Sequence, residues 1–332
     1  TPNVVIEAVS RTQIRQALPQ AACFVVPNVT SLRDFMRYRR SERTNWARLT
    51  RRETMAIFVP HDASPQEVRD CLHEELAQAL GPLNDLYRLR DSVFNDDNVH
   101  TVLTGFDMLI LRATYSPALR SGMSRTEVAA RLPRILSTLN PAGDGIPGRP
   151  QIGTPRAWID AIQTALGPGS STAQREAAIA RALQVAAEAR LDDHRRAFGH
   201  YIAGRMIQNQ DPDLAQRHYA TAQSYYDRTP GTELHQAYLS AQMAAHAISR
   251  GDGRAALARI GPAMAAARDA ENAGLLATLM LLQAEAFTLT GNLEAARAVR
   301  LDSLGWARYG FGPDWAVRAK MREIAVLNPA RF

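Results

Sequence analysis

The sequence lacks any apolar run of the roughly 18 residues that a membrane-spanning helix needs. It also lacks a signal peptide, and it begins at Thr1 without an initiator methionine. A predicted strand follows almost at once, at residues 3–9. The first of these absences excludes a predicted transmembrane segment. The others lead us to expect a processed or trimmed N-terminus, with localisation signals lost before Thr1.

Lysine is almost absent too. Lys320 is the only lysine among 39 basic residues, and the net charge is +6. We attribute so strong a preference for arginine over lysine to the base composition of the genome. The net charge by itself therefore does not predict a nucleic-acid partner. One local cluster of arginines with interleaved aromatic residues stands out; it consists of Arg37, Arg39, Arg40, Arg43, Arg48, Arg51 and Arg52, with Phe35, Tyr38 and Trp46 between them.

This arginine cluster has two interpretations. It is either a solvated helix and loop whose aromatic side chains pack inward, or an anionic-partner surface centred on Arg37, Arg39, Arg40 and Arg43. An acidic protein or an anionic lipid surface would suit it as well as nucleic acid would. No recognisable nucleic-acid-binding motif accompanies the cluster, so we do not expect nucleic acid as the partner.

Cysteine occurs only twice. Cys23 opens a short apolar strand, and Cys71 lies on the apolar side of a predicted helix that should pack on the same sheet. Buried free thiols are common, whereas a disulfide needs an oxidising compartment. The residues alone leave both states open.

Histidine is absent from the three positions at which the most informative motif of the sequence would need a metal ligand. From Glu74 the sequence reads Glu-Glu-x-x-Gln-x-x-Gly-x-x-Asn-Asp. Metzincin zinc peptidases carry His-Glu-x-x-His-x-x-Gly-x-x-His at this spacing. Glu75, Gly81 and every interval match, whereas Glu74, Gln78 and Asn84 stand at the positions of the three imidazoles. The motif therefore predicts a site without the zinc ligands of that class.

Local signals place this motif on a helix over residues 65–80. Ser64 is a cap followed by proline and, three residues after the cap, by glutamate; Gly81-Pro82 is a stop signal. Glu75 falls within the apolar stripe, and a carboxylate aimed into an apolar face is costly unless it is partnered or functional. The sequence therefore predicts a real site around Glu75. The stripe consists of Val68, Cys71, Leu72, Leu76 and Ala79.

The side chains at this site are poor ligands for zinc, which prefers imidazole and thiolate. We therefore predict neither a metal nor a cofactor; a weak calcium or magnesium site built from carboxylate and amide oxygens is the alternative. His73 projects away from the apolar stripe, which predicts a surface histidine. The acidic segment 91–98 does not match an EF-hand loop, and we expect a polar turn whose Asx side chains bond nearby backbone.

A chain of 332 residues predicts two domains. Residues 1–140 have the pattern of an α+β domain, 141–155 form a Pro/Gly-rich linker, and 156–332 are alanine-rich helix. The expected strands are 3–9, 23–27 and 55–60, and the expected helices of the first domain are 31–41, 65–80, 105–115 and 125–139.

The helical domain contains an internal repeat. Three similar segments, at 210–215, 251–256 and 291–296, recur at intervals of 41 and 40 residues. Each has the composition of a tight turn between two helices, so the pattern predicts helical hairpins that resemble tetratricopeptide repeats at a longer period. Such hairpins stack into a solenoid. We expect a protein partner to bind there, at 171–327.

Residues 1–140 resemble a family of uncharacterised bacterial envelope proteins with a degenerate metzincin-type domain. The motif helix, the turn at 92–96 and the turn at Gly122-Met123 carry the resemblance. It implies that Met123 lies beneath a small polar pocket of Glu74, Gln78, Asn84 and Asp85. The resemblance also implies an exported or lipid-anchored protein in the periplasm or envelope; the cytoplasm is the alternative location. It favours a disulfide bridge between the two cysteines.

Three functions remain in competition. The first is a non-catalytic envelope scaffold, in which a pseudo-peptidase domain is fused to protein-binding repeats. The second is a hydrolase that keeps Glu75 as general base, with an unusual metal or none. The third is a cytoplasmic regulator that binds nucleic acid through the arginine cluster. Loss of all three imidazoles favours the first.

Overall fold

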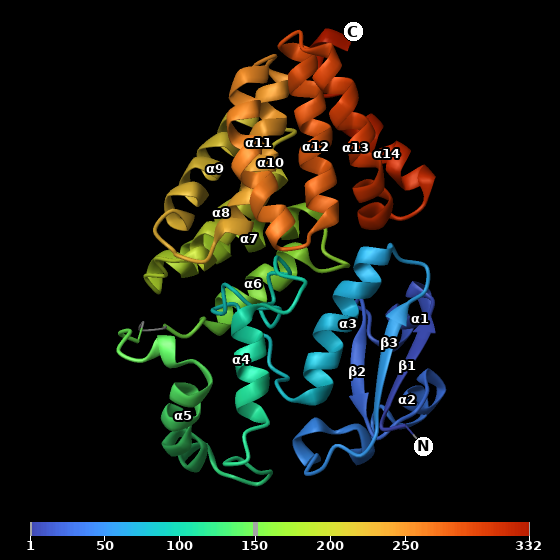
Figure 1. Cartoon of the computed structure of the whole chain (residues 1–332), viewed down its shortest axis with the longest axis vertical. Coiled ribbons are helices and arrows are strands. Elements are labelled where there is room, and N and C mark those ends of the chain that lie inside the picture. Colours follow the sequence, from blue (N-terminus) through green and yellow to red (C-terminus); the bar gives the residue numbers. More distant parts are fainter. Residues whose placement is uncertain (1, 149–151, 332) are drawn as a thin grey trace. The chain divides into compact units, whose positions relative to one another are not determined.

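The computed structural model describes residues 2–148 and 152–331 (Figure 1). A small three-stranded sheet with its helices comes first and a long all-helical region follows, which agrees with the predicted α+β domain and helical region. The chain divides into two compact units: unit 1 comprises Thr1–Ala63 and Val68–Gln151, and unit 2 comprises Ser64–Glu67 and Ile152–Phe332. Part of the expected linker, residues 149–151, lies outside the described residues.

The sheet of unit 1 has the strand order β1-β3-β2. β1 (Val4–Val9) pairs in parallel with β3 (Met55–Pro60), with Val4 opposite Met55. β2 (Phe24–Pro27) runs antiparallel to β3 along its other edge. Every residue of β3 is buried, because this strand has a neighbour on each edge and an apolar layer on each face.

One face of the sheet is covered by α1 (Arg11–Ala17) and α2 (Leu32–Tyr38). Three aromatic rings fill this layer: the ring centroid of Phe24 lies 4.8 Å from that of Phe58 and 5.1 Å from that of Phe35. α1 is absent from the predicted helices. Its signal is the capping box at its start, where the Ser10 side chain accepts a hydrogen bond from the backbone three residues on.

The other face of the sheet is covered by α3 (Pro65–Leu80), which has the predicted bounds (Figure 1). β3 presents Ile57 to this layer, since alternate residues of a strand face opposite sides. Cys23 and Cys71 meet here and form a disulfide. The bridge that the family resemblance favours is therefore present, and it ties α3 to the chain just before β2.

The rest of unit 1 consists of loops and two further helices. α4 (Gly105–Thr114) and α5 (Arg125–Leu139) pack against each other, and both begin with a capping box. Their bounds agree with the prediction to within one residue. α2 ends three residues earlier than expected, and short 3₁₀ turns follow it. The 3₁₀ turns of the described chain are Glu42–Thr44, Trp46–Arg48, Pro141–Gly143 and Pro329–Arg331.

Unit 2 is built from helices that pack against their neighbours in sequence. The strongest pairings are α8 with α9, α10 with α11 and α12 with α13, and each of the three recurring segments forms the turn within one of these pairs. The helices are α6 (Arg156–Leu166), α7 (Thr172–Glu188), α8 (His194–Ile207), α9 (Pro212–Tyr226), α10 (Glu233–Ser249), α11 (Gly253–Asp269), α12 (Ala273–Leu289), α13 (Leu293–Phe311) and α14 (Asp314–Ala325).

The same cap starts the second helix of each pair. Asp211, Asp252 and Asn292 each accept a hydrogen bond from a backbone N–H three residues on, at 2.8, 2.9 and 3.1 Å. Gly251 and Gly291 precede two of these caps with φ of 76° and 81°, a conformation that favours glycine. The repeated segments in the sequence are therefore the residues that end one helix of a pair and start the next.

Across the described residues no helix has the length and apolar content that a bilayer crossing requires.

Replacing both Cys23 and Cys71 by serine should lower the free energy of unfolding by about 2–4 kcal/mol, because the bridge closes a loop of 48 residues and so restricts the unfolded chain. Urea unfolding with and without dithiothreitol checks this. The reductant should bring the wild-type protein close to the double variant and leave the variant unchanged. A wild-type midpoint that does not respond to complete reduction would contradict it.

Candidate functional site

α3 carries the candidate site, and it is enclosed on two sides. Towards the sheet it buries Cys71; on another side Ala77 packs with Val93 and Phe94 from the loop that follows the helix. This second apolar layer corrects the expected stripe. Leu76, expected inside, is 36% exposed, whereas Ala77 is only 1% exposed.

Glu75 lies in this enclosure with 4% of its surface exposed. Its carboxyl group receives a hydrogen bond from the Val25 backbone, while its Oε2 atom has no hydrogen-bond partner. Burial raises the pKa of Glu75 well above its ordinary value, and the nearby Glu74 and Asp85 carboxylates raise it further. The raised pKa favours the protonated, neutral form of Glu75, which is the wrong form for a general base.

Glu74, Gln78 and Asp85 come together beside Glu75. The Gln78 side-chain amide donates to Asp85 Oδ1 and Oδ2 at 3.3 and 3.4 Å, and to Glu74 Oε1 at 3.5 Å. Asn84, the third position of the motif, is exposed, and it makes no side-chain hydrogen bond within the described chain. The chain therefore turns its next residue, Asp85, towards the helix.

The grouping of carboxylates changes how they titrate. Burial raises the pKa of Glu74 to about 7, with Asp85 and Asp96 adding to the effect. Burial and Asp96 likewise raise the pKa of Asp85 to about 6, although the hydrogen bond from Gln78 opposes the shift. Part of this group therefore holds protons near neutral pH, because several like charges share a poorly solvated volume.

Asp96 and Asp107 contribute to the site without having been identified from the motif. Asp96 acts through its charge, as described above. Asp107 is fully buried and accepts hydrogen bonds from the Ser92 hydroxyl and from the Val93 backbone, at 3.0 Å for the latter. It thus holds the loop that encloses α3. Its sequence signal is its place in the capping box of α4, three residues after Thr104.

The segment 91–98 forms the expected polar turn. The Asn95 side chain accepts from the Asp97 backbone at 3.2 Å, and the Asp97 side chain accepts from the Val99 backbone at 3.0 Å. His73 differs from the expected surface histidine: it is half-buried, and its Nδ1 accepts a hydrogen bond from the Leu103 backbone at 3.4 Å. The additional layer over α3 also accounts for this difference.

Met123 is half-buried in the turn before α5, immediately after Gly122, whose φ is 87°. The hydrogen bonds among the site side chains do not involve it. The donor set does not suit zinc, since Gln78 directs its N–H groups at the carboxylates and Asn84, a neutral amide, is exposed. Within the described ranges no cluster of three His, Cys, Asp or Glu side chains is arranged to hold a metal ion.

The arginines of the expected anionic-partner surface are exposed but only partly free. Arg39 donates to the Ala17 carbonyl at 3.2 Å, and Arg43 donates to the Asn28 carbonyl at 2.6 Å while lying over the Tyr38 ring. Arg37 also lies over that ring, and Arg40 makes no hydrogen bond or ion pair among the described residues. Much of the cluster therefore fastens the segment after α2 to its own domain.

Replacing Glu75 by glutamine should change the pH dependence of stability. Because the folded-state pKa is raised above its ordinary value of 4.5, the wild-type protein loses stability as pH rises above that value. Glutamine does not titrate, so E75Q should match the wild type at pH 4 and be more stable by about 1–3 kcal/mol at pH 8. Urea unfolding at both pH values measures this.

The control is E176Q, which removes a carboxylate from the exposed surface of α7 and should leave the pH profile unchanged. If E75Q is less stable than the wild type at pH 8, the ionised Glu75 carboxylate stabilises the fold. That result would contradict the prediction.

Residues 1–134 match a family model described as "Protein of unknown function (DUF2927)". The match includes the sheet, α3 and all the carboxylates of the candidate site, and it ends within α5. No curated protein and no solved structure matches the chain. The comparisons thus associate the first domain, but less than half of the chain, with an uncharacterised family.

Proposed function

We propose that the protein is a non-catalytic envelope scaffold, in which an inactive metzincin-like domain accompanies tetratricopeptide-like repeats that bind another protein. Two properties of unit 1 support the absence of catalysis. Burial and neighbouring carboxylates favour the protonated form of Glu75, and the side chains around it are carboxylates and an amide that donates hydrogen bonds. Such a site lacks both the base and the ligands with which a zinc peptidase activates water.

The observation that carries the binding role is a set of large exposed apolar side chains on the last helices of unit 2. Leu301 is 69% exposed and Trp315 is 67% exposed, and Trp306 and Tyr309 are also exposed. Large exposed side chains of this kind, aromatic residues above all, are typical of protein-binding surfaces. We refer to these four side chains as the α13–α14 surface.

Trp315 does not cover the last apolar face of the helical stack. Val317 and Met321 of α14 close that face instead, by packing with Ala277 and Ala307. The end of the stack is therefore already sealed, and Trp315 is left on the outside of α14. A side chain that is not needed for packing is available for a partner.

The disulfide supports location in the envelope. Bridged cysteines persist in the periplasm and other oxidising compartments and are rare in the cytosol. The bridge between Cys23 and Cys71 is therefore expected to form in cells only after export. The location can be tested by acidifying cells rapidly, which stops thiol exchange, and then alkylating the free thiols. Protein in the cytosol would carry two alkylated cysteines, whereas bridged protein would carry none.

The partner experiment uses the full chain. Leu301 and Trp315 are replaced together by alanine, and Leu166, an apolar residue of α6 that is 49% exposed, is replaced as the matched control. After crosslinking in envelope fractions, the partner that co-purifies with the wild type is identified and its affinity measured. The double variant should lose about 2 kcal/mol or more of binding free energy, whereas L166A and E75Q should retain it. Equal binding by the double variant would move the partner site elsewhere.

A separate experiment tests the inactive site. Hydrolysis of a fluorescent casein should be the same for the wild type and E75Q, with and without added zinc, because burial disfavours the ionised form of Glu75 and no imidazole stands at the three ligand positions of the motif. Turnover by the wild type that E75Q lacks would favour the hydrolase instead.

A further inference from the structure

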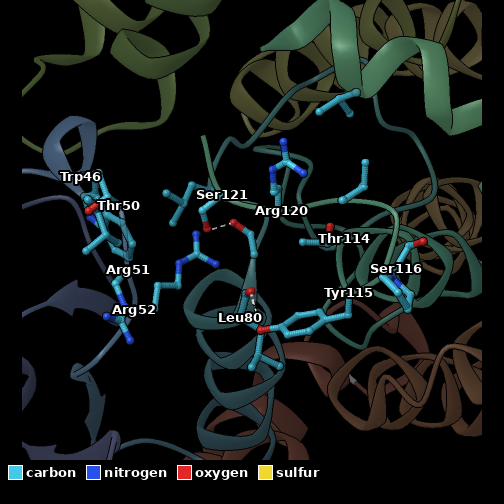
Figure 2. A pocket seen from close by; sticks show the side chains of 16 residues that line it. Trp46, Thr50, Arg51, Arg52, Leu80, Thr114, Tyr115, Ser116, Arg120 and Ser121 are labelled. Carbon is cyan, nitrogen blue, oxygen red and sulfur yellow. Dashed lines mark hydrogen bonds between the residues drawn. The ribbon is translucent and has the colours of Figure 1, made fainter. Parts of the chain in front are cut away.

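Unit 1 contains a pocket of about 790 Å³ beside the C-terminal end of α3 (Figure 2). The loop after the second 3₁₀ turn, with Arg51 and Arg52, forms one side, and the segment after α4, with Tyr115 and Ser116, forms the other. Arg120 and Ser121 complete it from the chain that leads into α5. The volume is in the range of small-molecule sites.

The charge of this pocket has one sign. Three of its lining residues are arginines, Arg51, Arg52 and Arg120, and none is an aspartate or a glutamate. The side chain of Arg120 has no hydrogen-bond or ion-pair partner in the described part of the chain. Arg51 is exposed and lies 3.6 Å from the Glu53 carboxylate outside the lining. The guanidinium groups are therefore available to an anion.

The end of α3 would by itself repel an anion, because a helix C-terminus carries partial negative charge. Two lining residues cover it: Arg52 donates to the Gly81 carbonyl at 2.8 Å, and the Tyr115 hydroxyl donates to the Leu80 carbonyl at 2.8 Å. Burial lowers the pKa of Arg52, a cost that a bound anion would offset. The hydrogen bonds from Arg52 and Tyr115 thus screen the negative C-terminal end of α3 from the pocket.

The remaining walls are largely apolar. Leu49, Leu83, Leu119 and Val128 line them, with the Trp46 ring. A purely inorganic ion would leave these side chains facing water. An apolar group attached to the anion would cover them, so the lining suits an amphipathic molecule better than a free ion.

We propose that this pocket binds an organic phosphate that carries an apolar group. Arginine pairs with phosphate oxygens through two parallel hydrogen bonds, and three guanidinium groups match the multiple charge of a phosphomonoester. The leucines and Trp46 hold the apolar part. This site is distinct from the carboxylates on α3, and of the arginine cluster found in the sequence it uses Arg51 and Arg52.

The test measures binding to the full chain by isothermal titration calorimetry. The probes are dihexanoyl phosphatidate below its micelle concentration, glycerol 3-phosphate, which lacks the apolar part, and dihexanoyl phosphatidylcholine, whose phosphate is a zwitterionic diester. We expect saturable binding of phosphatidate, and affinities about tenfold or more weaker for the other two. R120Q should weaken phosphatidate binding about tenfold, and R51Q/R120Q further.

The matched control is R40Q, which removes another exposed arginine of unit 1 that does not line the pocket. The affinity of this variant should stay within about twofold of the wild type. Circular dichroism confirms that each variant is folded, and Arg120 is chosen because it makes no internal bond. Equal weakening by R40Q would overturn the proposal in favour of diffuse attraction. Absence of saturable binding would overturn it outright. Equal affinity for glycerol 3-phosphate would overturn the assignment of an amphipathic ligand.

Discussion

The enclosure of α3 between two apolar layers is the constraint on which unit 1 depends. The sheet covers one side of this helix, and the loop around Val93 and Phe94 covers another. Because water is excluded from both sides, a carboxyl group on the helix loses most of its solvation. The same packing that forms the core therefore also decides the protonation of the candidate site.

Two buried glutamates show how much the surroundings matter. Glu285 in α12 is as buried as Glu75, but Arg300, Arg331 and Asn328 bond to its oxygens. Burial would raise the pKa of Glu285, and these hydrogen bonds lower it instead.

Glu75 faces other carboxylates and receives a single backbone hydrogen bond, so its pKa moves in the opposite direction. Glu285 is thus a structural anion that fastens the end of the helical array to α12. Glu75 is a neutral acid, and this difference follows from partners rather than from depth of burial.

The motif on α3 has the same spacing as the metzincin motif, but the residues at the three ligand positions differ. The interval between Glu75 and Gly81 still ends α3 and turns the chain back towards the helix. What the turn brings back is a carboxylate, Asp85, held by Gln78. A group of protonated carboxyls can respond to pH or stabilise a loop, but it does not supply the Lewis acid of a zinc peptidase. The proposed binding role therefore rests on the exposed apolar side chains of α13 and α14.

The sequence by itself determined the elements. Caps at Ser124, Asp211 and Asn292, the stop at Gly81 and the apolar strand at β3 act within a few residues, so local patterns predict them well. The helical periodicity also placed Glu75 on a buried face.

Only the tertiary structure decided the contacts between distant segments. The sequence did not reveal the second apolar layer, and so Leu76 was expected inside and His73 outside. It left the pairing of Cys23 with Cys71 open, and it gave no sign that Arg120 would join Arg51 and Arg52. It also placed Asn84 in the pocket together with Asp85, whereas Asp85 alone of these two residues bonds to a side chain of the helix. Each of these depends on where loops return in space, which neighbouring residues along the chain do not encode.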